Sequence, residues 1–204
     1  MKQSKIIAIT GSIASGKSQV TNFLKQLYYK VIDSDIISRD IINEREVIEK
    51  IKSYFGENLY SEGVLDRSAL ASIIFNDREK RDLLDSITHP LIYKRISEKI
   101  EEYKREKIVF VDIPLLIENG TKSYGMNFDE IWLVYADKET QIRRLMSRDN
   151  ISYDYANIKI SSQMSMEEKR KYADIILDNR GDLNELKDKV LKALNRLNKW
   201  KFYQ

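Results

Sequence analysis

One segment of the chain has residue types and a spacing suited to holding phosphate groups. Residues 11–18 read Gly-Ser-Ile-Ala-Ser-Gly-Lys-Ser, which matches the pattern G-x-x-x-x-G-K-[ST]. In such a loop the two glycines let the backbone curl so that successive N–H groups point at phosphate oxygens. The lysine then reaches the β- and γ-phosphates, and the last serine binds Mg²⁺. The predicted nucleotide-binding residues of this segment are Gly11, Ala14, Ser15, Gly16, Lys17, Ser18 and Gln19.

The residues on either side of this loop predict a strand before it and a helix after it. The apolar run Ile6-Ile7-Ala8-Ile9 precedes it, and apolar residues at helical spacing follow it, namely Val20, Phe23, Leu24 and Leu27. A helix that begins at the loop adds the partial positive charge of its N-terminus. This context favours a nucleoside-triphosphate site over the alternative, a glycine-containing turn that only joins a strand to a helix.

Two carboxylates follow the short apolar strand at Val31 and Ile32. In open α/β sheets, ligands bind beyond the carboxyl ends of the strands, so Asp33 is suited to take a proton from an acceptor hydroxyl. Alternatively, Asp33 is only an acid at the entry of the next helix. Asp35 is either a charge in the first turn of that helix, where the helix dipole favours it, or a part of the metal's surroundings.

A third acid and the only histidine mark two other candidate positions. The apolar strand at residues 108–112 ends in Asp112, as Mg²⁺-binding acids of the Walker B type do, so Ser18 and Asp112 are the predicted metal-binding residues. His89 precedes Pro90, which is one of two prolines in the chain. This histidine is either structural or, if the proline stops the preceding helix, an imidazole that faces the cleft.

Arg144 and Arg148 are one helical turn apart and share a face of the helix expected after the fourth strand. Guanidinium groups suit a transferring phosphoryl group because they spread charge and bind oxygens bidentately. The alternative is a solvated basic face that is paired with nearby acids such as Asp149. The phosphate-binding loop favours the catalytic interpretation.

Composition predicts a globular, cytoplasmic enzyme. Of the 204 residues, 42% are hydrophobic and 33% are charged, proportions typical of a folded domain. The absence of cysteine excludes disulfides, thiolate zinc sites and a cysteine nucleophile. No apolar run is long enough to span a bilayer, and the N-terminus lacks a signal-peptide pattern. The 35 basic residues are interleaved with 32 acidic ones, which favours a mixed solvated surface over nucleic-acid binding.

Alternating apolar runs and amphipathic stretches predict an α/β fold with a parallel sheet and helices on both faces. The expected strands are 5–10, 30–33, 108–112, 131–136 and 175–177. Residues 45–105 hold no convincing strand and repeat apolar residues at helical spacing, so we expect a helical cap over a substrate. The polar, helical residues 138–172 are expected to form a mobile lid. The core of this single domain is then 1–44, 106–137 and 173–204.

Several elements occur together from about residue 5 to about residue 197. They are Asp33-Ser34-Asp35 with Arg39, His89-Pro90, Asp112-Ile113-Pro114-Leu115-Leu116 with Glu118, the arginines Arg144 and Arg148, Gln163, and the segment Ala173–Asn179. In this combination the chain resembles the dephospho-CoA kinase family. The Asp-x-Asp, His-Pro and Asp-x-Pro-Leu-Leu elements together are far more specific than the phosphate-binding loop alone.

The resemblance implies ATP-dependent phosphorylation of the ribose 3′-hydroxyl of dephospho-CoA, which yields CoA and ADP. It also implies a three-layer fold of the P-loop NTPase type, with a five-stranded parallel sheet, a helical cap insertion and a helical lid. Magnesium ions would accompany ATP, the partner would be this small molecule with no nucleic acid or membrane, and the chain would be a monomer or a weak homo-oligomer.

The family's residue roles can be carried over to this sequence. Asp33 would be the base or orienting acceptor for the hydroxyl, and Lys17, Arg144 and Arg148 would act on the phosphates. Asn179 would contact the adenine. The residues that would line the dephospho-CoA pocket are Asp33, Arg39, His89, Leu115 and Glu118.

The loop departs from the family's common form, Gly-Gly-Ile-Gly-Ser-Gly-Lys-Ser-Thr, at Ser12, Ala14 and Gln19. Ala14 makes a positive φ at its position costlier than glycine would. Another P-loop kinase, for a small metabolite or a nucleoside, would keep the loop and the arginines but lack the His-Pro and Pro-Leu-Leu elements. A nucleic-acid-binding module without enzymatic activity is the alternative from a different class, and it predicts steeply salt-dependent binding.

Overall fold

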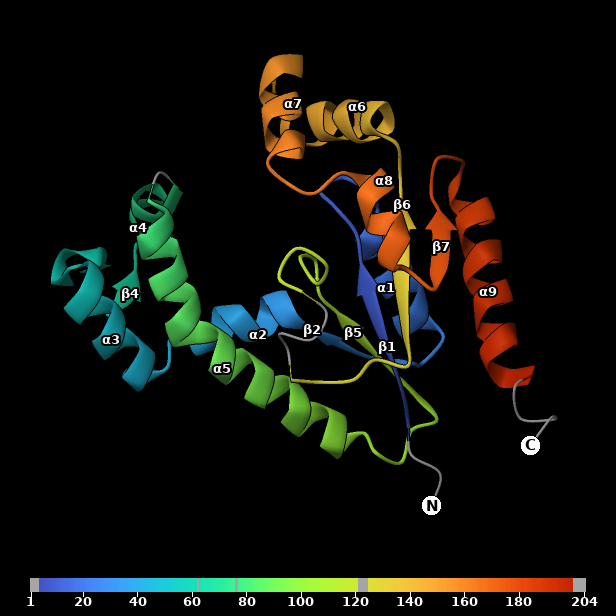
Figure 1. Cartoon of the computed structure of the whole chain (residues 1–204), viewed down its shortest axis with the longest axis horizontal. Helices are drawn as coiled ribbons and strands as arrows, with labels where there is room; N and C mark the ends of the chain where they lie inside the picture. The colour runs from blue at the N-terminus through green and yellow to red at the C-terminus, as the bar shows by residue number, and fades with distance from the viewer. Residues whose placement is uncertain (1–3, 62, 76, 121–124, 200–204) are drawn as a thin grey trace. The chain divides into compact units, whose positions relative to one another are not determined.

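Five strands form a parallel sheet in the order β2-β5-β1-β6-β7 (Figure 1). The computed structural model describes residues 4–61, 63–75, 77–120 and 125–199. The strands are β1 (Lys5–Thr10), β2 (Lys30–Asp33), β5 (Ile108–Asp112), β6 (Glu130–Tyr135) and β7 (Ile175–Asp178). The parallel sheet and all five of its strands are therefore confirmed. The fourth strand begins and ends one residue earlier than predicted, and the fifth extends to Asp178.

The chain divides into two structural units. The first consists of Met1–Ile32 with Glu102–Gln204, and it holds most of the sheet. The second consists of Asp33–Glu101 and is mainly helical. The extents that we assigned to core, cap and lid stay a prediction.

Helices cover both faces of the sheet in the first unit, because successive side chains of a strand point to opposite faces. On one face, Trp132 and Val134 of β6 share a buried cluster with apolar residues of α1 (Lys17–Gln26) and α9 (Leu183–Lys199). On the other face, Leu133 and Tyr135 contact Met166 of α8 (Met166–Lys169). The resulting helix–sheet–helix arrangement is the predicted three-layer fold.

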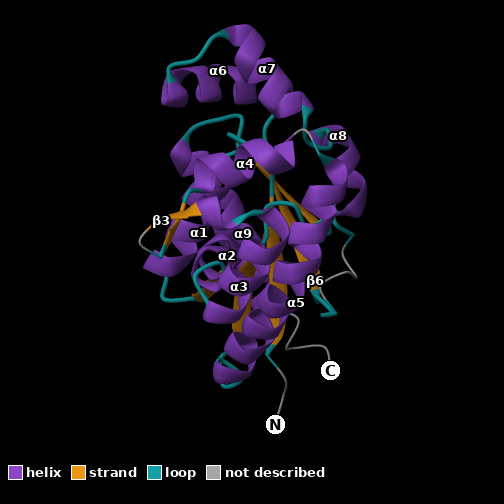
Figure 2. Cartoon of the chain, turned by 90° about the vertical axis from the view of Figure 1, so that its left-hand side faces the viewer, coloured by secondary structure: helices purple, strands orange, loops and turns teal. Residues whose placement is uncertain are grey.

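Two further helices of the first unit pack against each other, and both figures show them adjacent (Figures 1 and 2). They are α6 (Lys138–Asp149) and α7 (Tyr153–Ser161), joined by the buried side chains of Ile142, Leu145, Ala156 and Ile160. The phosphate-binding loop touches this cluster through Ile13 and Ala14. A short 3₁₀ helix, η2 (Arg170–Tyr172), follows α8 and leads into β7.

The second unit contains a short hairpin that the sequence analysis missed. Its helices are α2 (Ser34–Ile41), α3 (Arg45–Phe55), η1 (Glu57–Leu59), α4 (Arg67–Phe75) and α5 (Arg78–Glu102). Between η1 and α4, strand β3 (Tyr60–Ser61) pairs antiparallel with β4 (Val64–Leu65). The expectation of a strand-free cap was therefore wrong. Two-residue strands are too short to produce a visible period of two, and the turn at Gly63, with φ +81°, is the main local signal.

Pro90 does not end a helix. It lies inside α5, which continues beyond it to Glu102, so the idea that Pro90 stops the preceding helix was wrong. A proline removes one backbone hydrogen bond and strains the preceding turn. Helix α5 persists because buried residues on both sides of the proline, Ile87 before it and Ile92 and Ile96 after it, anchor the two halves.

Candidate active site

The phosphate-binding loop connects β1 to α1 and is packed too closely to accept a side chain at either motif glycine. Gly16 is the N-cap of α1 and has a φ of +91°. A Cβ atom added there would lie 2.0 Å from Nδ2 of Asn179. At Gly11 an added Cβ would lie 2.9 Å from the backbone carbonyl oxygen of Val134 and 2.6 Å from Oγ of Ser15. Real Cβ contacts do not come this close, so both positions require glycine.

Ala14 occupies a left-handed backbone conformation, with φ +57°. It is the third residue of a turn that is closed by a hydrogen bond from Ser15 N–H to the Ser12 carbonyl, 3.1 Å long. A non-glycine residue held in this region costs on the order of 1–3 kcal/mol. The loop therefore carries strain that the surrounding protein must offset.

Lys17, the motif lysine, forms an ion pair with Asp112. The carboxylate lies at the end of β5 and only 3% of the residue is exposed, whereas Ser18 is exposed on the first turn of α1. Both are oxygen donors of the kind that Mg²⁺ prefers. Among the described residues no group of three or more metal-ligating side chains is assembled. In nucleotide sites Mg²⁺ is usually bound by one or two carboxylates together with phosphates and water.

Asn179 follows β7 and links the loop to helix α6. Its amide Nδ2 donates to the Ser15 carbonyl at 2.8 Å and to Oε1 of Gln19 at 3.2 Å. Its own carbonyl accepts a hydrogen bond of 2.7 Å from Nη2 of Arg144. Asn179 is 2% exposed, so these bonds are shielded from water. The structure thus brings together the predicted residues Ser15, Gln19, Arg144 and Asn179.

Two buried polar atoms of this group lack a hydrogen-bond partner among the described residues. They are Oγ of Ser15 and Nη1 of Arg144. Burial, followed by repulsion from Arg143, holds the pKa of Arg144 below its ordinary value. Buried polar groups are nearly always paired in native proteins. A hydroxyl and a cationic donor left open beside a phosphate-binding loop fit an anionic, oxygen-rich ligand.

Arg148 behaves differently from Arg144. Its guanidinium forms two hydrogen bonds with the carboxylate of Asp149, at 2.7 and 3.2 Å, and 62% of its side chain is exposed. The hydrogen bond to Asp149 raises the pKa of Arg148. This is the surface ion pair that the sequence left open as the alternative. The structure does not bring Arg148 into contact with the loop, and its catalytic role stays a prediction.

Glu118 of the predicted substrate pocket lies against a buried lysine. Its Oε1 is 2.6 Å from Nζ of Lys169, whose side chain is fully buried in α8. Burial lowers the pKa of Lys169, and Glu118 opposes that shift. The sequence analysis did not single out Lys169, because one lysine among many carries no local signal. Leu115, in the same segment, is 39% exposed.

Asp33 is the N-cap of α2 in the second unit. One carboxylate oxygen, Oδ1, accepts hydrogen bonds from the N–H groups of Asp35 and Ile36, at 3.0 and 3.2 Å. The carboxylate is thus oriented, and Oδ2 is left out of the cap. Asp35 is exposed in the first turn of the same helix, where the dipole favours an acid. Arg39, toward the end of α2, is exposed as well.

His89 lies mid-helix between an acid and a phenol, each one turn away. Its Nε2 is 3.3 Å from Oδ1 of Asp85, and its Nδ1 is 3.1 Å from the Tyr93 hydroxyl. Burial raises the pKa of Asp85, and the attraction of His89 opposes that rise. Both ring nitrogens therefore have partners within α5. A substrate-binding role for His89 stays a prediction.

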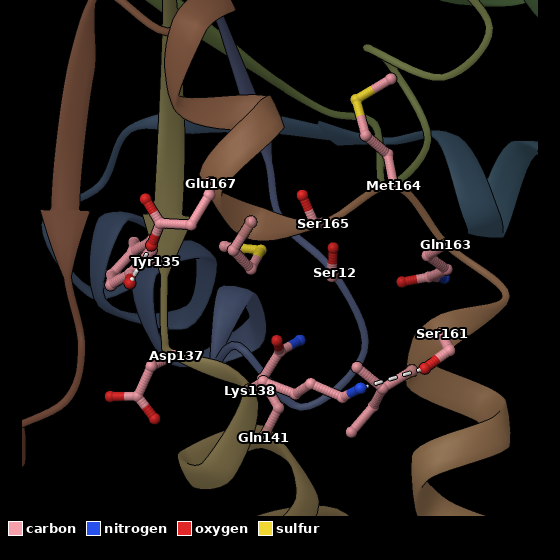
Figure 3. A pocket seen from close by; sticks show the side chains of 12 residues that line it. Ser12, Tyr135, Asp137, Lys138, Gln141, Ser161, Gln163, Met164, Ser165 and Glu167 are labelled. Atoms are coloured by element: carbon pink, nitrogen blue, oxygen red, sulfur yellow. Dashed lines mark hydrogen bonds between the residues drawn. The ribbon is translucent and has the colours of Figure 1, made fainter.

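Two glutamines lie beside the loop; the sequence analysis named Gln163 only as one element of the family resemblance, and it missed Gln141. Gln141 of α6 and Gln163, between α7 and α8, both bond to the backbone of Ile13. With Ser12 they line a pocket of about 430 Å³ (Figure 3). For Gln141 the one signal in the sequence was its position, a polar residue on the helix face that it shares with the buried Leu145.

A parallel sheet with a glycine-bounded phosphate loop, an adjacent Lys–Asp pair and an arginine of α6 beside that loop defines a P-loop kinase. Residues 5–185 match the family model described as dephospho-CoA kinase. The chain therefore belongs to the dephospho-CoA kinase family.

Individual proteins agree with this assignment. The chain is 42% identical over 200 residues to the dephospho-CoA kinase of Carboxydothermus hydrogenoformans, which covers 96% of this chain and 95% of that protein. Among solved structures it is similar to TT1252 from Thermus thermophilus, with a TM-score of 0.83, 35% identity and coverage of 96% and 98% of the two chains. It is also similar to the dephospho-CoA kinase of Campylobacter jejuni, with a TM-score of 0.72, 29% identity and coverage of 97% and 98%.

Proposed function

We propose that this chain transfers the γ-phosphoryl group of ATP to the ribose 3′-hydroxyl of dephospho-CoA, and so forms CoA and ADP. The observation that carries the proposal is the arrangement of the phosphate loop. Gly16 is packed against Asn179, and two buried polar groups beside the loop, on Ser15 and Arg144, have no partner among the described residues. Membership in the dephospho-CoA kinase family supplies the acceptor.

Lys17 and Arg144 would stabilise the phosphoryl group during transfer. Little covalent chemistry is asked of the protein, because catalysis of phosphoryl transfer consists of positioning and charge stabilisation. The Lys17 ammonium would exchange its pairing with Asp112 for phosphate oxygens when ATP binds. Arg144 would use its open Nη1 toward the nucleotide. Arg148 would have to leave Asp149 to take part, as a lid residue can do on closure.

Asp33 would orient the acceptor hydroxyl and accept its proton. Its Oδ1 already accepts two backbone hydrogen bonds, which fixes the carboxylate while Oδ2 remains outside the cap. Such preorganisation is what a general base needs. Arg39, His89, Leu115 and Glu118 would bind the rest of dephospho-CoA, and Asn179 would contact the adenine of ATP.

Ser18 and Asp112 would hold Mg²⁺ together with the ATP phosphates. The metal would supply charge neutralisation at the phosphate oxygens. Asp112 is suited to this because its carboxylate is buried and is already balanced by the ammonium of Lys17. When that ammonium turns to the phosphates, a second cation keeps the buried carboxylate compensated.

We also propose a cytoplasmic enzyme that acts as a monomer or weak homo-oligomer, with no nucleic-acid or membrane partner. Within the residues that the structure describes, every helix is too short or too polar to cross a bilayer. The interleaved basic and acidic residues also favour a small-molecule partner over nucleic acid.

The direct test offers the protein Mg-ATP with separate acceptors, namely dephospho-CoA, adenosine and other nucleosides, and identifies the products by chromatography. We expect CoA and ADP from dephospho-CoA only. Both substrates should also raise the melting temperature. The free energy of unfolding should increase by about 2.7 kcal/mol when a substrate is present at a hundredfold excess over its Kd. If ATP stabilises the protein, dephospho-CoA does not, and a nucleoside is phosphorylated, then dephospho-CoA is not the acceptor and the protein is another small-molecule kinase.

A further inference from the structure

The backbone of Ile13 in the phosphate loop is held from both sides by glutamine side chains. Its N–H donates to Oε1 of Gln163 at 2.9 Å. Its carbonyl accepts from Nε2 of Gln141 at 2.6 Å. Gln163 precedes α8 and Gln141 belongs to α6, so two segments 22 residues apart in sequence meet at a single residue of the loop. Neither bond belongs to the phosphate-binding motif.

The Ile13 carbonyl is part of the peptide group that decides the shape of the loop's turn. The turn Ser12–Ser15 closes with a backbone hydrogen bond, and the φ of Ala14 is +57°. A positive φ at the third residue is characteristic of a type II turn. The type I alternative would give Ala14 a negative φ and would rotate the Ile13–Ala14 peptide by roughly half a turn.

Alanine by itself favours the type I alternative, because a left-handed conformation is strained for any residue with a Cβ. Gln141 opposes that preference. If the Ile13–Ala14 peptide turned over, the Ile13 carbonyl would leave Nε2 of Gln141. Gln141 is only 2% exposed, so its amide would then lose a partner in a place that water barely reaches.

The orientation of this peptide also decides where the next N–H group points. The N–H and C=O groups of a trans peptide point in opposite directions. Gln141 draws the Ile13 carbonyl toward α6, and the Ala14 N–H is therefore directed away from α6. Inward-pointing N–H groups are what a phosphate loop offers to its ligand.

We propose that Gln141 and Gln163 are positioning residues that hold the phosphate loop ready for ATP against the strain at Ala14. Gln163 fixes the peptide before Ile13 and Gln141 fixes the peptide after it. Both side chains also line the pocket of Figure 3. In that pocket Nζ of Lys138, at the start of α6, donates a hydrogen bond to Oγ of Ser161, at the end of α7. The first turn of α6 and the connection between α7 and α8 are thereby both linked to the loop.

The chemistry of the two amides gives the test its direction. Gln141 must donate, because its partner is a carbonyl, whereas Gln163 must accept, because its partner is an N–H group. Gln141→Glu removes the donor and sets a carboxylate against a carbonyl oxygen. Gln163→Glu keeps the acceptor. Each Glu variant is compared with the Met variant at the same position, which keeps the volume and removes both functions.

We expect Gln141→Met to weaken ATP binding by about 3- to 10-fold, the worth of one hydrogen bond, and Gln141→Glu to weaken it more. At position 163 the order should reverse, with Glu closer to the wild type than Met. The effect of the added charge alone would make both Glu variants worse than their Met counterparts, and that result would overturn the proposal. ATP affinity is measured by calorimetric titration without any acceptor.

A second experiment removes the backbone strain at Ala14. In an Ala14→Gly background the positive φ has no steric cost, so Gln141→Met should weaken ATP binding by no more than about twofold. An equal loss in both backgrounds would reduce Gln141 to a structural residue and overturn the proposal, as would no loss in either. Gln26→Met, on the exposed end of α1, is the matched control. Melting temperatures without ATP show that each variant is folded.

The inference rests on the proposed function only in taking ATP as the ligand of the loop. Failure of the wild type to bind ATP would overturn both. Binding of ATP without phosphorylation of dephospho-CoA would overturn the proposed acceptor and leave the role of the glutamines standing. If Gln141→Met does not fold, the comparison of Gln163→Glu with Gln163→Met, at a partly exposed position, tests the proposal without it.

Discussion

The ammonium of Lys17, at the start of α1, is paired with the carboxylate of Asp112 at the end of β5. Both side chains are largely shielded from water, with 17% and 4% of their surfaces exposed. The residue that is expected to bind phosphate is therefore balanced by an acid. ATP binding would exchange one partner of Lys17 for another, rather than bring a lone charge out of water.

This pairing separates the effects of Lys17 on stability and on turnover. Lys17→Met should lower kcat/KM by about 10²–10³, as the loss of one positioned donor does. It should also lower the melting temperature, because removal of the Lys17 ammonium leaves the buried carboxylate of Asp112 less compensated. The double variant Lys17→Met/Asp112→Asn should recover the melting temperature and remain inactive. A double variant as unstable as Lys17→Met would show that the pair does not compensate a buried charge.

The two lid arginines should differ in what they contribute. Arg144 is partly buried and bonded to the carbonyl of Asn179, so Arg144→Ala should weaken ATP binding and lower kcat. Arg148 is exposed, so Arg148→Ala should lower kcat by about 10²-fold while the ATP dissociation constant hardly moves. Arg143→Ala, an exposed neighbour on the same helix, is the control and should stay within about twofold of the wild type. An unchanged kcat for Arg148→Ala would show that Arg148 has no catalytic role and belongs to the solvated surface.

The sequence was sufficient to predict the sheet because its strands are apolar almost throughout. Strand β5 is buried at every position, and such strands form continuous hydrophobic runs. The phosphate loop was predictable for a related reason, since Gly16 has a positive φ that favours glycine. Features set by local backbone geometry and burial can be derived from one chain.

Features that depend on contacts between distant residues could not be derived in this way. The effect of Pro90 was overridden by the packing of Ile87 and Ile92 on either side of it. The bonds of Gln141 and Gln163 to Ile13 span more than a hundred residues and are made to backbone atoms, so the residue types alone do not reveal these contacts. Tertiary packing decided these points, and local propensity did not.

Acid should destabilise the lid helix through its capping residue. Asp137 is the N-cap of α6, and the hydrogen bond from the Thr140 N–H lowers the pKa of its carboxyl below the ordinary 3.8. A lowered pKa contributes stability above the ordinary value, and this is lost as the pH falls through the folded-state value. The loss therefore begins near pH 4 and grows below it. Asp137→Asn keeps the cap but does not titrate, so its urea midpoint should fall less steeply than that of the wild type between pH 6 and pH 3.

The exposed Asp154→Asn, in the first turn of α7, is the control for the pH experiment. It should follow the wild-type curve more closely than Asp137→Asn does. If both variants show the same pH dependence, the cap of α6 does not contribute to acid sensitivity.

Asp33 has two roles in the proposal, and one substitution separates them. Asn is as good an N-cap as Asp, so Asp33→Asn should keep the bonds to Asp35 and Ile36 and leave the melting temperature unchanged. It removes the ability to accept a proton, and kcat should therefore fall by about 10²–10⁴. A loose transition state would put the loss at the low end, since the hydroxyl need not be deprotonated early. Steady-state kinetics with dephospho-CoA and a separate ATP titration measure the two effects.

Asp33→Ala and Asp35→Asn complete this experiment. Asp33→Ala removes both cap and base, so it should lose the same activity as Asp33→Asn and also about 1 kcal/mol of stability. Asp35→Asn should retain most turnover, because its side chain is exposed in the first turn of α2. Near-normal turnover of Asp33→Asn together with loss of turnover in Asp35→Asn would transfer the proton-accepting role to Asp35. In that case Asp33 would act on the reaction only through the helix that it caps.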